Sequence, residues 1–423
     1  MKNHEIIELV KREVVTAIGC TEPIAVALCT AKAVETLGCL PQKIEARLSA
    51  NILKNAMGVG IPATGMTGLP IAIALGALVG KSEYGLEVLR DVTPEAVEEG
   101  KKYIDDGRVD VKLKNGECDI LYIEIEVSDG EQTALAVISG SHTNFVRVER
   151  CGEPVTVGEG ACSEAEAESD LPLTMRTVYD FCMTAPLEDI EFIMEAARLN
   201  KAAAEASFKG EYGHSLGRTI LTGQRSAILG DGVFSRILAY TSGACDARMS
   251  GAMIPVMSNS GSGNQGISAT MPVVVYAEEM KASHEQFVRA LMLSHLTVIY
   301  IKQSLGRLSA LCGCVVAATG SSCGLVHLMG GGYEEITYAV KNMIANLTGM
   351  ICDGAKPSCA MKVTSGISTA VMSAMLAMEH RVVQSTEGII DDDVDRSILN
   401  LTRIGREGMT QTDSLILDIM THK

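Results

Sequence analysis

The feature that most constrains the fold is an alternating segment inside a chain that otherwise shows helical periodicity. Across residues 108–156, apolar and polar residues alternate, and turn signals such as Asn115-Gly116 and Asp129-Gly130 interrupt the alternation. This pattern predicts three or four antiparallel strands. Because helical patterns flank the segment, we predict an α+β protein, with a predominantly helical body and a small inserted antiparallel β lobe.

The same composition shifts predict how the chain is divided. Before the β segment, we expect a helix over residues 3–40 and a short strand over Lys43–Leu53. After it, the acidic stretch Ser163–Asp170 is expected to be an exposed connector to a second helical region. The predicted parts are an N-terminal helical part, a β-rich lobe and a C-terminal helical part, at residues 1–105, 106–160 and 161–423.

The composition supports a large aliphatic core and disfavours some partners. Of the 423 residues 47% are apolar and 21% charged, which argues against general disorder. Aromatic residues make up only 4%, with no Trp, whereas Gly and Met number 41 and 21. Such a core suits closely packed helices. The net charge of −16 disfavours binding to nucleic acid, since no basic patch offsets it.

The sequence also predicts a cytoplasmic protein without a membrane partner. Its N-terminus is polar and amphipathic, unlike the apolar core of a signal peptide. The most apolar segment, Leu69–Gly80, is shorter than the roughly 20 residues that span a bilayer. In a reducing compartment, clusters among the 13 cysteines indicate metal binding or catalysis more often than disulfides.

The sharpest cysteine cluster combines Leu311–Cys314 with Cys352–Cys359. Pro357 and the neighbouring glycine predict a loop that can turn two thiolates toward one metal site, with a third arriving from the other segment. Thiolates in a reducing compartment select zinc, Cu(I) or iron–sulfur clusters. The wide spacing favours a [4Fe–4S] cluster with one open iron, but structural cysteines explain the spacing equally well.

Cys20 lies in Gly19–Pro23, at a break between two helical stretches. A cysteine just before a helix can have its thiol pKa lowered by the helix dipole, which would suit proton transfer. The plainer interpretation is that Thr21 caps the next helix with Pro23 in its first turn.

Two polar strings could bind a small ligand, and a third is of the same polar kind. Asn51, Lys54 and Asn55 combine one cation with two amides, which could hold the carboxylate and amino group of an amino acid. The string Ser258–Gly266, which contains Asn264, offers the backbone amides of an anion-binding loop but lacks the Lys-Ser/Thr ending of a P-loop. The third string surrounds His142. Each string could also be an ordinary loop.

Together these strings resemble the L-cysteine desulfidase family, which is related to the alpha domain of iron–sulfur L-serine dehydratases. The seven strings, in order along residues 19–413, are GCTEP, NILKNAMGVGIP, GSHTNFV, NSGSGNQGI, LCGC, CDGAKPSC and GMTQTD. The resemblance implies a [4Fe–4S] cluster on three cysteines, no pyridoxal phosphate, and β-elimination from a small amino acid to pyruvate, ammonia and either sulfide or water.

Carried onto this chain, the resemblance implies that Cys352 and Cys359 bind the cluster. The third ligand is Cys312 or Cys314, with Cys312 favoured, and Cys20 matches the family's N-terminal cysteine. L-cysteine is the favoured substrate because the serine–histidine signature of the serine dehydratases is missing.

Two further functions and the assembly state stay open. L-serine, or another β-substituted amino acid, is the alternative substrate. A non-catalytic iron–sulfur or thiol sensor is the alternative from another class. A homo-oligomer is one of the assembly states that the sequence leaves open.

Overall fold

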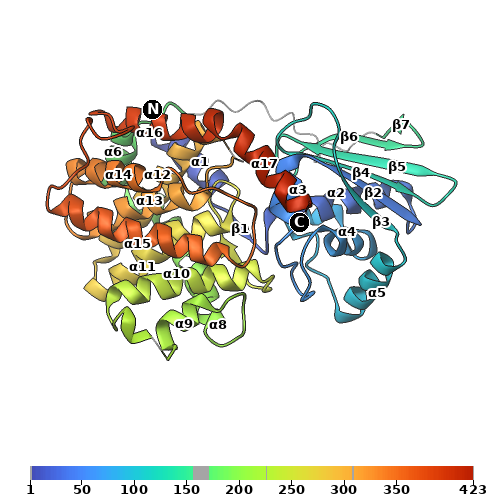
Figure 1. The fold of residues 1–423 in the computed structure, drawn as a ribbon, viewed down its shortest axis with the longest axis horizontal. Helices are drawn as coiled ribbons and strands as arrows, with labels where there is room; N and C mark the ends of the chain where they lie inside the picture. Colours follow the sequence, from blue (N-terminus) through green and yellow to red (C-terminus); the bar gives the residue numbers. More distant parts are fainter. Residues whose placement is uncertain (1, 156–170, 225, 307–308, 423) are drawn as a thin grey trace.

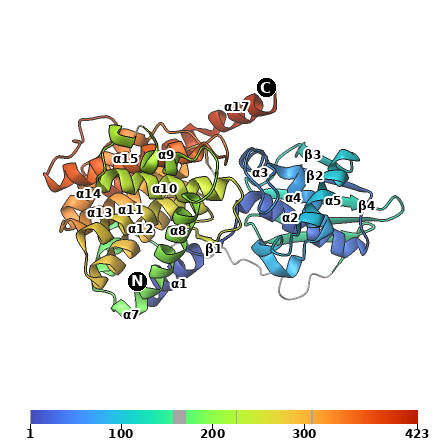
Figure 2. The ribbon, with the colours of Figure 1, turned by 90° about the horizontal axis from the view of Figure 1, so that it is seen from below.

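The computed structural model describes residues 2–155, 171–224, 226–306 and 309–422. Its helices and strands form two lobes that lie side by side (Figures 1 and 2). One lobe consists almost entirely of helices, and the other packs helices against a sheet. Each lobe has its own hydrophobic core.

The α/β lobe is formed by residues 21–155 and contains a six-stranded sheet with the order β3-β2-β4-β5-β6-β7. Its elements are α2 (Thr21–Leu37), β2 (Lys43–Leu48), α3 (Ala50–Ala56), α4 (Leu69–Leu78), η1 (Ser82–Glu87), α5 (Pro94–Asp105), β3 (Val109–Leu113), β4 (Tyr122–Ser128), β5 (Thr133–Ser139), β6 (Phe145–Arg150) and β7 (Glu153–Pro154). β2 pairs parallel to β3, and the other neighbours pair antiparallel.

Helix α2 is the centre of this lobe. It packs against β4 and β5 on one side and against α4 on the other. Ile44, Ala46 and Leu48 of β2 alternate toward this core, as expected for a strand with one buried face. Since α2 is covered on both sides, most of its residues are buried, and the charged Lys32 and Glu35, which are not buried, lie in its C-terminal half.

The helical lobe combines the N-terminal segment with the chain after residue 170. Its elements are α1 (Asn3–Glu13), β1 (Thr16–Ala17), α6 (Met175–Thr184), α7 (Leu187–Ile190), η2 (Glu191–Ile193), α8 (Met194–Ser207), α9 (Leu216–Thr222), η3 (Ser226–Ile228), α10 (Val233–Met249), β8 (Val256–Met257), α11 (Gly263–Met280), α12 (His284–Leu305), α13 (Gly313–Leu328), α14 (Tyr333–Leu347), α15 (Cys359–Met378), α16 (Val394–Arg403) and η4 (Ile404–Gly408). A last helix, α17 (Thr410–Thr421), follows.

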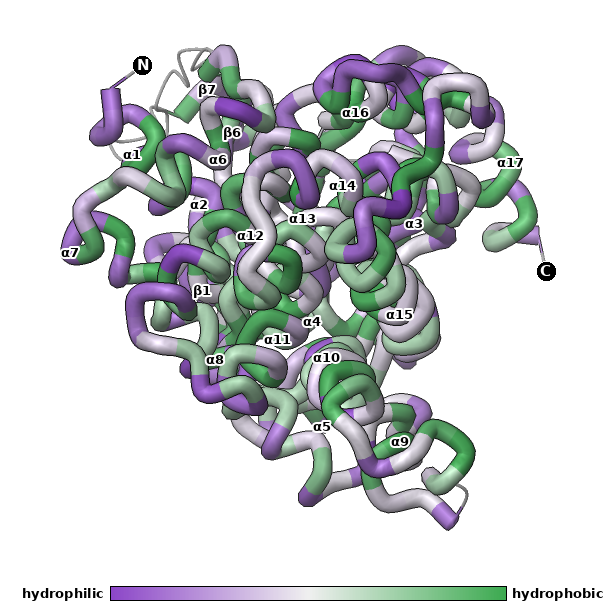
Figure 3. The backbone as a smooth tube through the Cα atoms, turned by 90° about the vertical axis from the view of Figure 1, so that its left-hand side faces the viewer, coloured by the Kyte–Doolittle hydropathy of each residue, from purple (hydrophilic) through white to green (hydrophobic). Residues whose placement is uncertain are grey.

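Helix α13 is surrounded by α11, α12, α14 and α15. The close approach of α12 and α13 requires glycine at position 320, because a Cβ there would lie 2.4 Å from the carbonyl oxygen of Ser294. Figure 3 shows the consequence of this packing: the tube is hydrophobic along inner helices such as α11, and hydrophilic residues gather at the outer turns.

The two lobes are joined by segments from both ends of the chain. After α1 and β1, the chain passes into α2 at Cys20. Helix α17 runs from the helical lobe toward the α/β lobe (Figures 1 and 2) and packs against α3, where Leu417 enters the second core. The start of α2, the helix α3 and the start of α17 therefore lie where the lobes meet.

The predicted fold class is confirmed, since a helical body accompanies a small sheet. Three local predictions need correction. The helix expected over residues 3–40 is two helices, interrupted where β1 pairs with β8. The strand expected over Lys43–Leu53 ends at Leu48, because Ser49 caps α3 by accepting a hydrogen bond from the backbone of Ile52. The sheet is mixed rather than antiparallel, because β2, which lies outside the alternating segment, pairs parallel to β3.

The boundary predictions have a different outcome. The ranges 1–105, 106–160 and 161–423 stay predictions. The boundary at residue 160 and the connector Ser163–Asp170 lie outside the described residues. By length and composition alone, α15 is apolar enough to cross a membrane, and half of its apolar window is buried inside the protein.

Candidate active site

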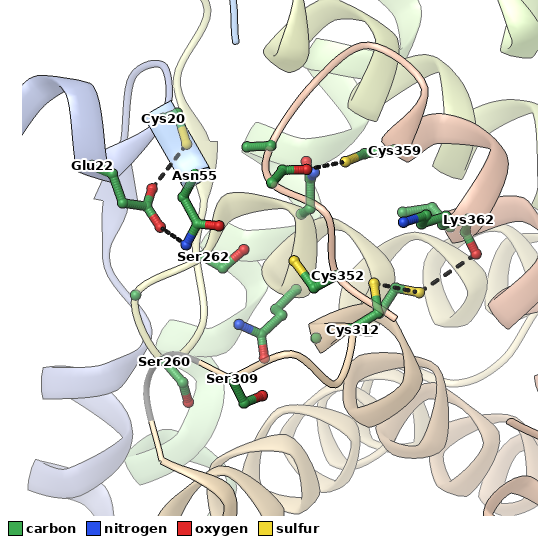
Figure 4. Close-up of a pocket in the computed structure, with 18 of the residues that line it drawn as sticks. Cys20, Glu22, Asn55, Ser260, Ser262, Ser309, Cys312, Cys352, Cys359 and Lys362 are labelled. Atoms are coloured by element: carbon green, nitrogen blue, oxygen red, sulfur yellow. Dashed lines mark hydrogen bonds between the residues drawn. The ribbon is translucent and has the colours of Figure 1, made fainter. Parts of the chain in front are cut away.

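A cavity of about 110 Å³ lies where the two lobes meet (Figure 4). A water molecule needs only about 10–15 Å³ in the same kind of measure, so the cavity has room for a larger group. The residues that the sequence analysis singles out and that line it include Cys20, Asn55, His142, Asn264, Cys312, Cys314, Cys352 and Cys359. They come from both lobes and from positions up to 339 residues apart (359 minus 20).

Backbone pairing holds the cysteine segments together on one side of the cavity. The backbone N–H of Cys312 donates to Met350 at 2.9 Å, and that of Cys352 donates to Ala310 at 2.7 Å. Cys312 is also the residue before the first turn of α13, and Cys359 is the first residue of α15. The three sulfurs are thus presented by three short backbone segments around one space.

The electrostatic environment keeps these thiols protonated when no metal is bound. The neighbouring Cys314 thiol and burial raise the pKa of Cys312. The contact with Cys312, together with burial, raises the pKa of Cys352 well above its usual value. Burial is the largest cause of the raised pKa of Cys359. A bound metal would replace these protons, since thiolates are its ligands.

The donor set fits a cluster better than a single ion. Within the described ranges, no group of three or more His, Cys, Asp or Glu side chains is arranged to hold one metal ion. A [4Fe–4S] cluster has several irons and takes its cysteine thiolates on different ones, so its ligands surround a space rather than a point. Three thiols from separate segments around the cavity meet that requirement.

Cys314 is the alternative third ligand, and it lies beside Cys312. The Cys312 thiol donates to the Cys314 sulfur at 3.4 Å. The Cys314 thiol is directed to the backbone oxygen of Lys362 at 3.5 Å and to the sulfur of Met350 at 3.2 Å. Because the Cys312 thiol also interacts with Cys352, it is the better placed of the two.

On the other side of the cavity, Cys20, Glu22 and Asn55 form a hydrogen-bonded group (Figure 4). The Cys20 thiol donates to Oε2 of Glu22 at 3.0 Å, and the Asn55 amide donates to Oε1 at 3.1 Å. All three side chains are buried. The sequence produces this arrangement locally, because Cys20 precedes the first turn of α2 and Glu22 lies in that turn.

The predicted lowering of the Cys20 pKa by the helix dipole is wrong. Burial is the largest effect and raises the pKa well above its usual value, and the Glu22 carboxylate raises it further. Arg248 lowers it, but not enough to compensate. Burial and the neighbouring carboxylate therefore both favour the neutral thiol.

The loop before α11 forms another part of the wall. The Thr21 hydroxyl donates to the backbone oxygen of Gly261 at 3.1 Å, which ties the loop to the start of α2. Asn264, in the first turn of α11, accepts a hydrogen bond from Nη1 of Arg248 at 3.1 Å through Oδ1. The loop that was predicted to bind an anion therefore faces the cavity beside an arginine.

Comparison with known proteins identifies the family of this chain. Residues 83–418 match the family described as serine dehydratase alpha chain. The chain belongs to this family. The serine dehydratase alpha chain family is generally associated with iron–sulfur clusters, and membership indicates a lyase-type enzyme.

The similarity to individual relatives covers nearly the whole chain. A UPF0597 protein of Bacteroides fragilis is 68% identical over 419 residues, covering 99% of this chain and 98% of the relative. Those of Bacteroides thetaiotaomicron and Oleidesulfovibrio alaskensis are 66% and 50% identical, each over 99% of this chain and 98% and 97% of their own length. The match to the serine dehydratase alpha chain family includes all three candidate cluster cysteines, whereas Cys20 and Glu22 precede it.

Two predicted residues lie elsewhere. Lys54 is buried in an ion pair with Asp413 of α17, and its ammonium donates to the backbone oxygen of Cys352 at 3.3 Å. Asn51 lines a neighbouring cavity of about 450 Å³ that also contains Asp413. Their predicted contact with substrate stays a prediction, and no contact in the described structure supports it.

Sequence reasoning missed Arg248 and the part played by Glu22. Glu22 was visible as a member of the Gly19–Pro23 string, but nothing local indicated its contact with Asn55, which is 33 residues away. Arg248 has no sequence signal, because an arginine near the end of a helix is usually exposed. His142 lines the cavity, as its polar string suggested.

Proposed function

We propose that this protein catalyses β-elimination from a small α-amino acid, with L-cysteine as the favoured substrate and pyruvate, ammonia and sulfide as products. One observation carries the proposal: the buried Cys312 and the half-buried Cys352 and Cys359, which have the chemistry of cluster ligands, line one small cavity with a hydrogen-bonded Cys20–Glu22 pair. A cytoplasmic location accords with the reduced thiols that this chemistry needs.

In this proposal Cys312, Cys352 and Cys359 would hold a [4Fe–4S] cluster. With only three protein ligands, the cluster would supply Lewis-acid chemistry toward the leaving sulfur or oxygen. Cys20 is not among the ligands, because its thiol points to Glu22 on the opposite side of the cavity (Figure 4).

The chain itself moves the proton. Removing hydrogen from Cα requires a nearby base, and a neutral thiol cannot serve as one. The Glu22 carboxylate accepts the thiol hydrogen bond at Oε2, so it can take the Cys20 proton while the Cys20 sulfur takes the proton from Cα. Asn55 keeps Glu22 in place through its bond to Oε1. Burial of the pair excludes bulk water, which would otherwise compete for these protons.

L-serine is the second candidate, and the match to the serine dehydratase alpha chain family favours it. The chemistry is the same, with water leaving instead of sulfide. A non-catalytic iron–sulfur sensor would use the same cysteines but would not need a proton-transfer pair in the cavity.

The test is an anaerobic assay of the iron-loaded protein with L-cysteine, L-serine and their D-forms, measuring pyruvate and sulfide. Pyruvate with sulfide from L-cysteine is expected, and pyruvate from L-serine alone would select the second candidate. Absence of pyruvate from all four, in protein with a full cluster absorption band, would refute the lyase proposal.

Variants of the thiols complete the test. Cys352→Ser and Cys359→Ser should lose iron and activity together, because a serine oxygen is a poor substitute for thiolate on iron. Cys118→Ser, at an exposed cysteine between β3 and β4, is the matched control and should keep both. Full iron content in both loop variants would rule out this ligand assignment.

A further inference from the structure

The cavity contains a buried arginine that the proposed chemistry does not yet use. Arg248 lies in the last turn of α10, is only 3% exposed and lines the cavity. Nη1 donates to Asn264, whereas the buried Nε has no hydrogen-bond partner. Across the described ranges, no carboxylate forms an ion pair with Arg248. A buried guanidinium without an anion is unfavourable, so this site favours binding one.

The guanidinium is held against the start of a long helix. A Cβ on Gly263, the first residue of α11, would lie 2.2 Å from Nε of Arg248, so the two are in close contact. Helix α11 has 18 residues, and its first backbone N–H groups add positive potential at the same place. Gln265, in the same turn, has a buried side-chain oxygen without a partner and also lines the cavity.

We propose that Arg248, together with the first turn of α11, binds the α-carboxylate of the substrate. The inference rests on the proposed function for the identity of the amino acid, but the subsite itself is defined by the guanidinium and the helix. Arginine suits a carboxylate because its planar fork can donate two parallel hydrogen bonds.

The subsite also explains how the substrate is oriented. Arg248 lies close enough to Cys20 to lower the pKa of its thiol, so the carboxylate end would lie near the proton-transfer pair. Cα is bonded to the carboxyl carbon, so a carboxylate held by Arg248 brings Cα close to Cys20, within reach of proton transfer. The β-substituent then points toward the thiols on the other side of the cavity.

Binding of unreactive probes tests the subsite without turnover. L-alanine has the carboxylate and L-alaninamide lacks it, and calorimetric titration of the anaerobic iron-loaded protein measures both. Wild-type protein should bind L-alanine about 10–10²-fold more tightly than L-alaninamide, the usual scale for hydrogen bonds to a charged group. In Arg248→Gln this preference should disappear.

Two further variants make the test specific. Arg236→Gln removes the same charge from α10 at a position paired with Glu279, outside the cavity, and should leave the preference unchanged. Gly263→Ala keeps the arginine but displaces the guanidinium, so it should weaken L-alanine binding by about 10-fold. It also provides the test if Arg248→Gln does not fold.

The outcomes separate this inference from the proposed function. The subsite would be overturned if Arg248→Gln and Gly263→Ala both kept the full preference for L-alanine over L-alaninamide. Loss of iron in Arg248→Gln would also overturn it, because the guanidinium would then serve to stabilise the thiolates of the cluster ligands. Elimination of L-cysteine with an unchanged KM in Arg248→Gln would overturn the subsite alone. If wild-type protein eliminates neither L-cysteine nor L-serine but prefers L-alanine, and Arg248→Gln loses that preference, the subsite is supported and the proposed function is refuted.

Discussion

The ion pair between Lys54 and Asp413 allows a quantitative test of how the lobes are joined. It links α3 of the α/β lobe to α17, while the same ammonium donates to the backbone oxygen of Cys352. The Lys54 side chain is 2% exposed and that of Asp413 is 18% exposed. Breaking a buried pair by removing one partner costs about 3–5 kcal/mol, because the other charge stays buried without compensation.

The two single variants should differ in cost. Asp413→Asn leaves an ammonium with almost no access to water, so its cost should lie near the upper end of that range. Lys54→Met leaves a carboxylate that still reaches solvent, so its cost should lie near the lower end. Replacing both residues, as in Lys54→Met with Asp413→Leu, should restore most of the stability, since a packed apolar pair of similar volume avoids the desolvation cost.

Differential scanning calorimetry of the metal-free protein measures these costs. The entropy of unfolding is about 2.1 cal/mol/K per residue, or about 0.9 kcal/mol/K for 423 residues. A loss of about 3–5 kcal/mol therefore lowers Tm by about 3–6 °C. Lys81→Met breaks the exposed pair with Asp91 and should leave Tm within about 1 °C of wild type. A larger loss for Lys54→Met than for Asp413→Asn, or losses no larger than the control, would refute the reasoning from burial.

Three further predictions concern the site and the core. Cys20→Ala should keep its iron and cluster absorption while kcat falls about 10²-fold or more, the scale for losing a positioned acid or base; loss of the absorption would make Cys20 a ligand instead. Glu22→Gln keeps the shape but cannot accept a proton, so kcat should again fall about 10²-fold or more with little change in KM; a raised KM with an unchanged kcat would indicate a role in substrate binding instead. Burial lowers the pKa of His295 to about 3, so this side chain stays neutral in the folded protein below pH 6.5, where the unfolded chain takes up a proton. On account of this residue, the free energy of unfolding should therefore fall by about 1.4 kcal/mol for each pH unit from pH 6 to pH 4. Denaturant titrations at several pH values measure this fall, which should be missing in His295→Gln. An equal fall in wild type and His295→Gln would contradict the prediction.

Local patterns in the sequence were sufficient for the fold class and the strands. The alternation in residues 108–156 predicts strands because side chains in a strand point to opposite faces in turn, and β4, β5 and β6 follow it. The addition of β2, and its parallel pairing with β3, could not be predicted. The partner of β2 is β3, which begins about 60 residues after β2 ends, and local alternation carries no information on such a distant pairing.

The candidate site divides in the same way. Spacing and residue type indicated the cysteine loop, Cys20 and Asn264, because glycine, proline and thiols restrict local geometry and chemistry. The burial of Arg248, the raised pKa of the Cys20 thiol and the pairing of Lys54 with Asp413, 359 residues away, come only from the tertiary structure. The charge and hydrogen bonding of a buried side chain depend on which distant segments exclude water around it, and that is decided when the two lobes pack together.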